Sequence, residues 1–211
     1  MALKITGDIS NLIKLAAELQ KFGTERNIVS VFDDGGYREM LLATLFNLKL
    51  HLGRQGDDAI DDVTHNYELK TVNLVDTSGN LRKNPGITTC HHVNHEILTR
   101  YRNLHSWIIG VFFINEPVEI YEVPNKAFVP YFDVWEKQLT TSTTGHINNP
   151  KIRFSDVRKY GIKHYENKDL ADKYINGSLK KGTGVYKDIL SFDKTKITIR
   201  NEQLQAETEG V

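Results

Sequence analysis

The chain has 211 residues and a balanced charge, with 27 Lys and Arg residues against 27 Asp and Glu residues. This length suits one domain and is ample for a continuous hydrophobic core. The net charge of zero excludes a protein that binds polyanions over its whole surface, although a DNA-binding groove needs only local positive potential.

The sequence also indicates a cellular compartment. The N-terminus has no basic region followed by an apolar run, as a secretory signal would have, and no segment reads as a membrane span. Cys90 is the single cysteine and cannot form an intramolecular disulfide. We therefore expect a protein of the reducing cytoplasm that makes no membrane contact.

Two amphipathic helices are predicted in the first 50 residues. The first has Ser10 as a good N-cap and Gly23 as a residue that can end it. Its apolar residues recur at helical spacing, at Leu12, Ile13, Ala16, Leu19 and Phe22. The second follows the turn at Gly35-Gly36, with the same spacing at Met40, Leu41, Thr44, Leu45 and Leu48. From the pattern alone, packing onto the protein's own sheet and formation of a dimer interface explain these helices equally well.

A strand that carries functional residues is predicted at 66–72, where β-forming residues alternate with charged ones. Because side chains on a strand repeat with a period of two, Glu68 and Lys70 share one face. The preceding segment, 56–62, is acidic and turn-like. A hairpin back onto the strand would bring Asp58 within a metal's reach of Glu68.

These residue types suit a magnesium-dependent nuclease. Magnesium binds through one or two carboxylates together with waters and phosphate oxygens, which Asp58, Glu68 and a scissile phosphate would supply. Lys70 could position a metal-activated water or stabilise charge on phosphorus. A solvated strand edge with weak ion pairs explains the same pattern equally well. The neighbouring acids that compete with Asp58 as ligands are Asp57, Asp61 and Asp62.

The rest of the pattern predicts an α/β fold with a central mixed β-sheet flanked by helices. Residues 107–114 form an apolar run typical of a buried strand, and 118–123 alternate as its half-buried partner, with a turn at 115–117 between them. Short helices are expected at 93–102 and 127–137. The aromatic face of the second helix indicates core packing rather than a surface for base stacking.

Three polar groups outside the catalytic strand have ordinary explanations when each is taken alone. His91 and His92 read as surface or core-polar histidines. Asn148-Asn149-Pro150 reads as a turn, and Asp34 reads as a turn residue or a helix cap before Tyr37. None of these patterns indicates base recognition by itself.

Several segments match a known family in order: Gly53-Arg54, Asp58-Ala59, Tyr67-Glu68-Leu69-Lys70, Thr89, His91-His92, Asn94, Tyr101-Arg102 and Ile147-Asn148-Asn149-Pro150-Lys151-Ile152. Through them the sequence from Ile28 to about Tyr165 resembles the PvuII restriction endonucleases, in the PD-(D/E)xK nuclease superfamily. The resemblance implies a restriction-endonuclease-like core with an N-terminal helical dimerisation region. It also implies a type II enzyme, a homodimer that binds a short CAGCTG-like palindrome in double-stranded DNA and cuts it bluntly with Mg²⁺. A companion DNA methyltransferase would protect the host.

The resemblance also implies roles for individual residues. Asp58, Glu68 and Lys70 correspond to the catalytic residues, with Asp58 and Glu68 as the metal ligands, and Tyr101 corresponds to a tyrosine close to the active site. The implied DNA contacts are Asp34, Thr88, His91, His92, Asn148 and Asn149. Among them, Asp34 would contact the minor groove. In the major groove a histidine N–H can donate to guanine O6 or N7, and Asn149 can bond both N6 and N7 of adenine.

The resemblance divides the chain into an endonuclease domain, 1–165, and an extension, 166–211, of unknown role. The domain comprises a helical dimerisation part, 1–50, and a catalytic and DNA-recognition part, 51–165. The extension is polar, offers little core and ends in a stretch that contains an edge-strand pattern at 196–200. It could lengthen the DNA-contacting surface, cover a sheet edge or stay partly mobile.

Three departures from the family pattern bear on function. Cys90 stands in the place of the first of three histidines, and Gln55 stands in the place of a glutamate near the catalytic aspartate. The loop 75–87 is several residues longer than its counterpart and adds Arg82 and Lys83. These departures leave open the target sequence and the number of metals, and they favour extra phosphate contacts from the loop.

Two other functions share part of this pattern. A repair or junction nuclease on the same core would cut by structure or mismatch, and it would not need base-edge readers such as His91, His92 and Asn149. A DNA-binding module that has lost its activity would explain Gln55. It would not explain why all three catalytic residue types are retained.

Overall fold

The computed structural model describes residues 9–33, 36–51, 58–76, 78, 80–83 and 85–179. At its centre is one sheet, whose strands are β1 (Lys49–Leu50), β2 (Ala59–Ile60), β3 (Asn66–Asn73), β6 (Ser106–Phe113), β7 (Glu116–Pro124) and β10 (Ile162–Glu166). Their order across the sheet is β1-β2-β3-β6-β7-β10. β3 and β6 run parallel, whereas the other neighbours are antiparallel, so the sheet is mixed.

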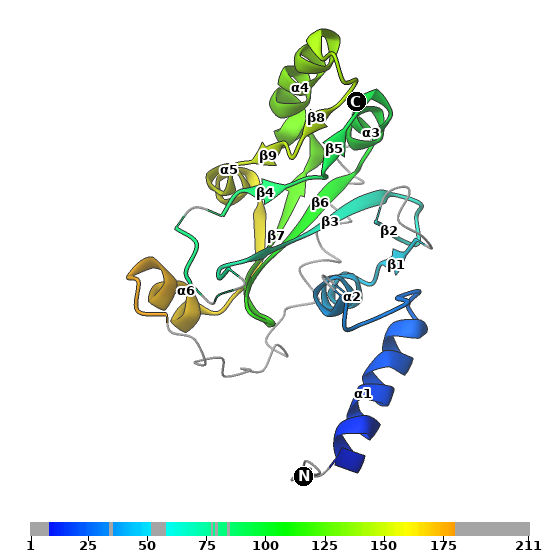
Figure 1. The fold of residues 1–211 in the computed structure, drawn as a ribbon, viewed down its shortest axis with the longest axis vertical. Coiled ribbons are helices and arrows are strands. Elements are labelled where there is room, and N and C mark those ends of the chain that lie inside the picture. Colours follow the sequence, from blue (N-terminus) through cyan, green and yellow to red (C-terminus); the bar gives the residue numbers. More distant parts are fainter. Residues whose placement is uncertain are drawn as a thin grey trace, which may run out of the picture.

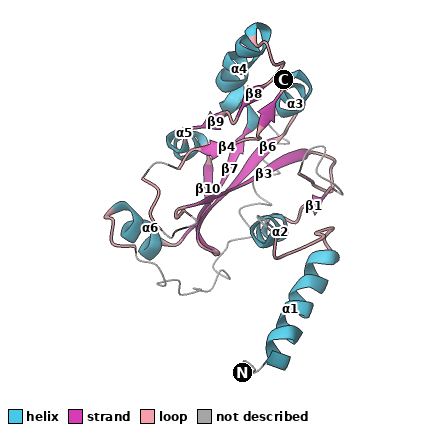
Figure 2. Ribbon diagram, viewed as in Figure 1, coloured by secondary structure: helices cyan, strands magenta, loops and turns pink. Residues whose placement is uncertain are grey.

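The helices are α1 (Ile9–Thr24), α2 (Gly36–Leu45), α3 (His95–Arg102), α4 (Val129–Thr141), α5 (Phe154–Tyr160) and α6 (Lys168–Ile175). Helices lie on both faces of the sheet, whereas α1 extends away from it (Figures 1 and 2). On β6, Ile108 packs with Leu42 of α2, whereas the next residue, Ile109, belongs to the cluster that contains Tyr101 of α3 and Phe132 of α4. Successive strand residues therefore meet opposite layers. The expected α/β fold with a central mixed sheet is confirmed.

The hairpin of β6 and β7 is the most buried part of the sheet. Every residue of β6 is buried, in keeping with its apolar run. The connecting turn is Ile114 and Asn115, with Ile114 at φ 60°. β7 begins at Glu116, so the turn expected at 115–117 is shorter. Pro117 lies inside the strand, where the register shifts, and a bulge is a place at which a strand tolerates proline.

The two N-terminal helices form, but their ends differ from the expected ones. α1 begins at Ile9, so Ser10 lies within the helix and is not its N-cap. Gly23 also lies within α1, where it is buried and an added Cβ would come within 2.2 Å of Val31 Cγ2. The glycine allows close packing, and it is Asn27, at φ 65°, that takes the left-handed conformation.

Two short ribbons, separate from the central sheet, carry the expected DNA contacts Thr88, His92 and Asn148, and His91 and Asn149 lie directly beside their strands. β4 (Ile87–Thr88) pairs with β9 (Lys151–Ile152), and β5 (His92–Val93) pairs with β8 (Ile147–Asn148). We call these four strands the recognition ribbon. Because Val93 belongs to β5, the helix expected from residue 93 begins only at His95, with Asn94 as its N-cap.

The helix expected at 127–137 is α4, which begins at Val129 after the single 3-10 turn Asn125–Phe128 and extends to Thr141. Its aromatic residues Phe132 and Trp135 are buried in the core cluster, as is Phe128. The expectation that this aromatic face packs into the core is confirmed.

The first part of the extension after residue 165 belongs to the folded core, which corrects the expectation of little core. Leu170 and Ala171 of α6, followed by Leu179, are buried against residues of β6 and β7, including Val111 and Val118. Asn167 caps α6 and accepts from the backbone N–H of Leu170. Residues 180–211, which include the strand pattern at 196–200, lie outside the described residues. Within the described ranges no helix is long and apolar enough to cross a membrane.

Candidate active site

The hairpin expected from the acidic segment is present. β2 pairs antiparallel with β3, with Ala59 opposite Tyr67. The backbone N–H of Asp58 donates to the Tyr67 carbonyl at 3.1 Å, which anchors Asp58 at the end of this hairpin. The side chain is fixed as well, because the Leu69 N–H donates to Asp58 Oδ2 at 2.8 Å. No signal in the amino-acid pattern indicates this positioning role of Leu69, since it uses only the backbone.

The structure separates Asp58 from two acids that competed with it. Asp61 forms the β2–β3 turn, where its Oδ1 accepts from the backbone N–H of His65 at 2.9 Å and its Oδ2 from the hydroxyl of Tyr67 at 2.9 Å. Burial acts to raise the pKa of Asp61, but these hydrogen bonds outweigh it and leave the pKa below its ordinary value. Asp62 pairs with Lys49 at 2.9 Å. Asp57 and Gln55 lie outside the described residues.

Asp58, Glu68 and Lys70 are brought together by this hairpin. The ammonium Nζ of Lys70 is 2.5 Å from Glu68 Oε1 and 3.6 Å from Asp58 Oδ2. Side-chain exposure rises along the group, from 6% for Glu68 to 19% for Lys70 and 37% for Asp58. Asp58 therefore lies at the solvent-facing edge of the group, and Glu68 lies at its buried end.

The two carboxylates of the group change the pKa of Lys70. Burial acts to lower the pKa of Lys70, but the negative charges of Glu68 and then Asp58 dominate and raise it above its ordinary value. The two carboxylates therefore favour the charged form of Lys70, which can donate hydrogen bonds and stabilise negative charge.

Tyr101 approaches the same group from α3. It is 3% exposed, and its ring lies 4.9 Å from that of Trp107 on β6. Burial, followed by the charge of Glu68, raises the pKa of its hydroxyl well above the ordinary value, with Lys70 acting in the opposite direction. Tyr101 thus presents a neutral phenol close to the charged residues.

Asp58 and Glu68 suit a divalent cation by their donor chemistry. Both carboxylates approach the one ammonium group of Lys70, so a single cation can lie near both. The described part of the chain gathers no group of three or more His, Cys, Asp or Glu side chains that could hold a metal. Two carboxylates are nevertheless sufficient for magnesium, which keeps several waters and takes further oxygens from a phosphate substrate.

The recognition ribbon presents two matched pairs of side chains to solvent. The ring Nδ1 of His91 lies 2.9 Å from Asn149 Oδ1, and that of His92 lies 2.8 Å from Asn148 Oδ1. All four residues are exposed. The pairing aligns the four polar groups along one ribbon.

These pairs bear on the tautomer of each histidine. With the amide oxygen facing the ring, Nδ1 donates and the neutral ring offers Nε2 as an acceptor. The expected donation from Nε2 to guanine would need the other tautomer, with the asparagine amide turned or moved away.

The structure places Thr88 and Cys90 but not Asp34. Thr88 is exposed on β4 and faces Lys151 across the ribbon. Asp34 lies outside the described residues. Cys90 is half-buried and packs against the core cluster beside α3, which agrees with a small hydrophobic role.

A comparison with known protein families finds that residues 5–165 match the family described as Restriction endonuclease PvuII. The match begins earlier than the expected start at Ile28, so it also includes α1. It ends at Tyr165, which agrees with the expected end of the resemblance. The whole β2–β3 hairpin and the recognition ribbon lie within the matched residues.

Proposed function

Since this chain belongs to the PvuII family of restriction endonucleases, and is therefore a type II restriction endonuclease, we propose that it hydrolyses one phosphodiester in each strand of a short DNA palindrome. The observation that supports the chemistry best is the convergence of Asp58, Glu68 and Lys70 at the end of one hairpin. Restriction endonucleases of this family generally use a divalent metal, and we propose Mg²⁺ because both available ligands are carboxylates.

Each residue of the group has a distinct role in the proposed reaction. Asp58 and Glu68 would hold the metal, which when bound lowers the pKa of a water and neutralises charge on phosphate oxygens. The Lys70 ammonium donates to the attacking water or to a phosphate oxygen, and it stabilises the negative charge that grows on the phosphate in the transition state. Tyr101 supplies a neutral hydroxyl nearby.

We propose that the recognition ribbon reads a CAGCTG-like site in the major groove. His91 and His92 would contact guanine, and Asn149, supported by His91, would contact adenine. Asn148 and Thr88 would complete the contacts. Asp34 stays a predicted minor-groove contact, from the resemblance alone.

We also propose that the active protein is a homodimer that leaves blunt ends. A palindrome has twofold symmetry, and cutting both of its strands requires two active sites, which a C2 dimer supplies. The assignment of residues 1–165 to the endonuclease function, a companion methyltransferase and a cytoplasmic location belong to the same proposal.

The test is digestion of a long duplex DNA by the purified protein with Mg²⁺, with an EDTA control, followed by mapping of every fragment end. The proposal predicts discrete, metal-dependent fragments whose ends fall at the centre of one palindrome. Intact DNA with sequence-specific retention would instead indicate an inactive binding module. Nicks without a common sequence would indicate a repair-type nuclease.

A further inference from the structure

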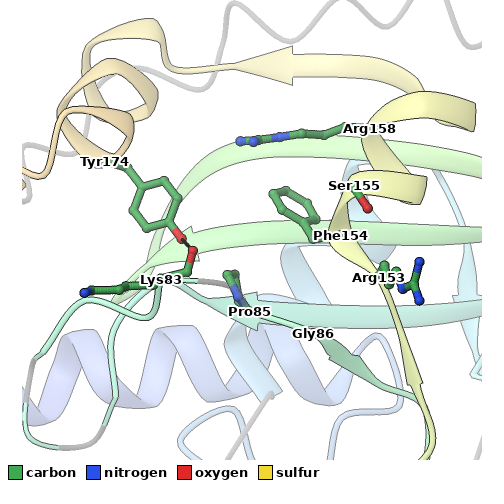
Figure 3. Close-up of a pocket in the computed structure, with 8 residues that line it drawn as sticks. All are labelled: Lys83, Pro85, Gly86, Arg153, Phe154, Ser155, Arg158 and Tyr174. Carbon is green, nitrogen blue, oxygen red and sulfur yellow. Dashed lines mark hydrogen bonds between the residues drawn. The ribbon is translucent and has the colours of Figure 1, made fainter.

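A pocket of about 380 Å³ lies at the outer end of the recognition ribbon (Figure 3). Gly86, immediately before β4, and Arg153, immediately after β9, both line it. The ribbon that carries the predicted base readers therefore continues directly into this pocket. The residues that line it are Lys83, Pro85, Gly86, Arg153, Phe154, Ser155, Arg158 and Tyr174.

Three cationic side chains, Lys83, Arg153 and Arg158, line the pocket together with apolar surface such as Pro85 and the Phe154 ring. Lys83 and Arg153 lie on opposite sides of it, and Arg158 extends above the Phe154 ring toward Tyr174 (Figure 3). Arg158 is balanced by Glu119 at 2.8 Å and is held over Phe154, with its guanidinium 4.5 Å from the ring centre. Among the described residues no ion pair balances Lys83 or Arg153, so the pocket carries excess positive charge.

A fourth cation, Lys151, lies next to the lining. The side chain of Lys151, on β9, passes so close to Gly86 that a Cβ added there would come within 3.1 Å of Lys151 Cδ. Lys151 is exposed and faces Thr88 across the ribbon. Positive side chains thus continue from the predicted base-contacting region to the pocket.

The pocket depends on a part of the chain that the family match does not cover. The hydroxyl of Tyr174, on α6, donates to the backbone carbonyl of Arg82 at 2.5 Å and lies 3.4 Å from that of Lys83. α6 follows the end of the match at residue 165 and is anchored in the core by Leu170. The loop 75–87, which is expected to be longer than its family counterpart, and the segment after the family match are therefore joined through Tyr174.

We propose that this pocket binds the sugar–phosphate backbone of DNA outside the palindrome, with Lys83 and Arg153 contacting phosphates. The inference rests on the proposed function. An extended polyanion fits two cations on opposite sides of a pocket, because a strand that crosses it can meet both. Four residues along the chain separate the predicted reader Asn149 from Arg153, which limits their separation to roughly 13 Å, or about four base-pair steps.

The experiment compares binding of two duplexes in EDTA, measured as fluorescence anisotropy at several salt concentrations. One duplex contains the cleavage site with minimal flanks, and the other adds about one helical turn, roughly 10 base pairs, on each side. Wild-type protein is expected to bind the long duplex roughly tenfold more tightly. The double variant Lys83→Gln/Arg153→Gln should bind both duplexes with the short-duplex affinity of wild type. Its salt slope should be lower by about 0.9 for each phosphate that the variant no longer neutralises.

Two further comparisons test whether the contacts are made to phosphates and whether Tyr174 holds the loop that carries Lys83. Flanks with neutral methylphosphonate linkages should bind wild type like the short duplex, since only phosphate charge is removed. Tyr174→Phe, which removes the hydrogen bond to the loop, should reduce the preference for the long duplex. Lys159→Gln/Lys173→Gln is the control, because it removes the same charge from α5 and α6 outside the pocket lining. This control should keep the wild-type preference for the long duplex.

The inference would be overturned if wild type bound both duplexes with equal affinity. It would also be overturned if Lys159→Gln/Lys173→Gln lowered the affinity for the long duplex as much as Lys83→Gln/Arg153→Gln does. Site-specific cleavage of the short duplex in Mg²⁺ separates this outcome from failure of the proposed function. If wild type cuts the short duplex but gains nothing from flanks, only the pocket assignment fails. If it neither binds nor cuts either duplex, both proposals fail.

Discussion

Asn149 combines an unusual backbone conformation with a fixed side chain. Its φ of 47° lies in the left-handed region, and its amide oxygen is held by His91. Asparagine tolerates this conformation better than most residues, so the same residue can turn the chain and present an amide to DNA.

This double role determines how base reading by Asn149 should be tested. Asn149→Gly keeps the turn without strain, whereas Asn149→Ala adds the cost of a Cβ at positive φ. If the amide bonds adenine in two places, both variants should lose about 1 to 3 kcal/mol of discrimination against sites substituted at that base pair. Cleavage rates on the parent and substituted sites measure this loss. Unchanged discrimination in Asn149→Gly would leave Asn149 as a turn residue only.

The raised pKa of Tyr101 makes a prediction about catalysis. Because the pKa lies above its ordinary value, the hydroxyl stays protonated as pH rises through the working range, and it cannot serve as a general base. Tyr101→Phe should therefore reduce the cleavage rate by about tenfold at most, with a pH–rate profile parallel to that of wild type. Loss of a general base would cost roughly 10² to 10⁴ and remove a limb of the profile.

Among the helices, α6 marks where the folded core extends past the family match. Leu170 is 4% exposed, whereas Ile175 on the same helix is 71% exposed. Leu170→Ala should lower the free energy of unfolding by about 2 to 5 kcal/mol, because it leaves a cavity in a packed cluster. Ile175→Ala should change it by less than about 0.5 kcal/mol. Urea unfolding measures both, and equal effects would show that α6 does not belong to the core.

The positions of the strands could be predicted because their patterns are local, but the expected half-burial of 118–123 is wrong, since Glu119 and Glu122 of β7 are only 3% and 2% exposed. The apolar run of β6 and the alternation in β3 require only that one or both faces be buried. Helix ends were less predictable, since tertiary packing decides them. Gly23 resembles a helix end but is a close contact with Val31, and Val93 pairs with Ile147 in the recognition ribbon instead of starting a helix.

The sequence predicts which residue types form the candidate site, but it does not show which of several aspartates belongs to it. Four aspartates lie within 57–62, and only the hairpin shows that Asp61 forms the turn while Asp58 approaches Glu68. The pairs between histidines and asparagines join residues more than 50 positions apart. No local pattern could indicate such contacts, and only the family resemblance pointed to these residues.

In the molecule as a whole, α1 extends away from the sheet (Figure 1). Leu12, Ile13 and Leu15 are 66%, 63% and 56% exposed, while Leu19 is partly buried near Met40. Uncovered apolar residues on one helix suit a contact between subunits. They support the dimer interface over the alternative that α1 packs only onto its own subunit.

The dimer proposal predicts that Leu12→Ser/Leu15→Ser is monomeric in sedimentation equilibrium at concentrations at which wild type is a dimer. The variant should also fail to linearise a plasmid that carries one site, because double-strand cutting needs two active sites. Val134→Ser, which removes an apolar residue that is 52% exposed on α4, serves as the matched control. A monomeric wild type that still cuts both strands would rule out the interface.

The active-site assignment is tested best by single-turnover cleavage measured beside site-specific binding for Asp58→Ala and Lys70→Ala. The control is Asp62→Ala, which removes an acid from the same segment that pairs only with Lys49 among the ion pairs described. We expect both site variants to lose cleavage by about a thousandfold or more and to keep folding and specific binding, while the control cuts like wild type. Cleavage near the wild-type rate by either site variant would show that the active site lies elsewhere.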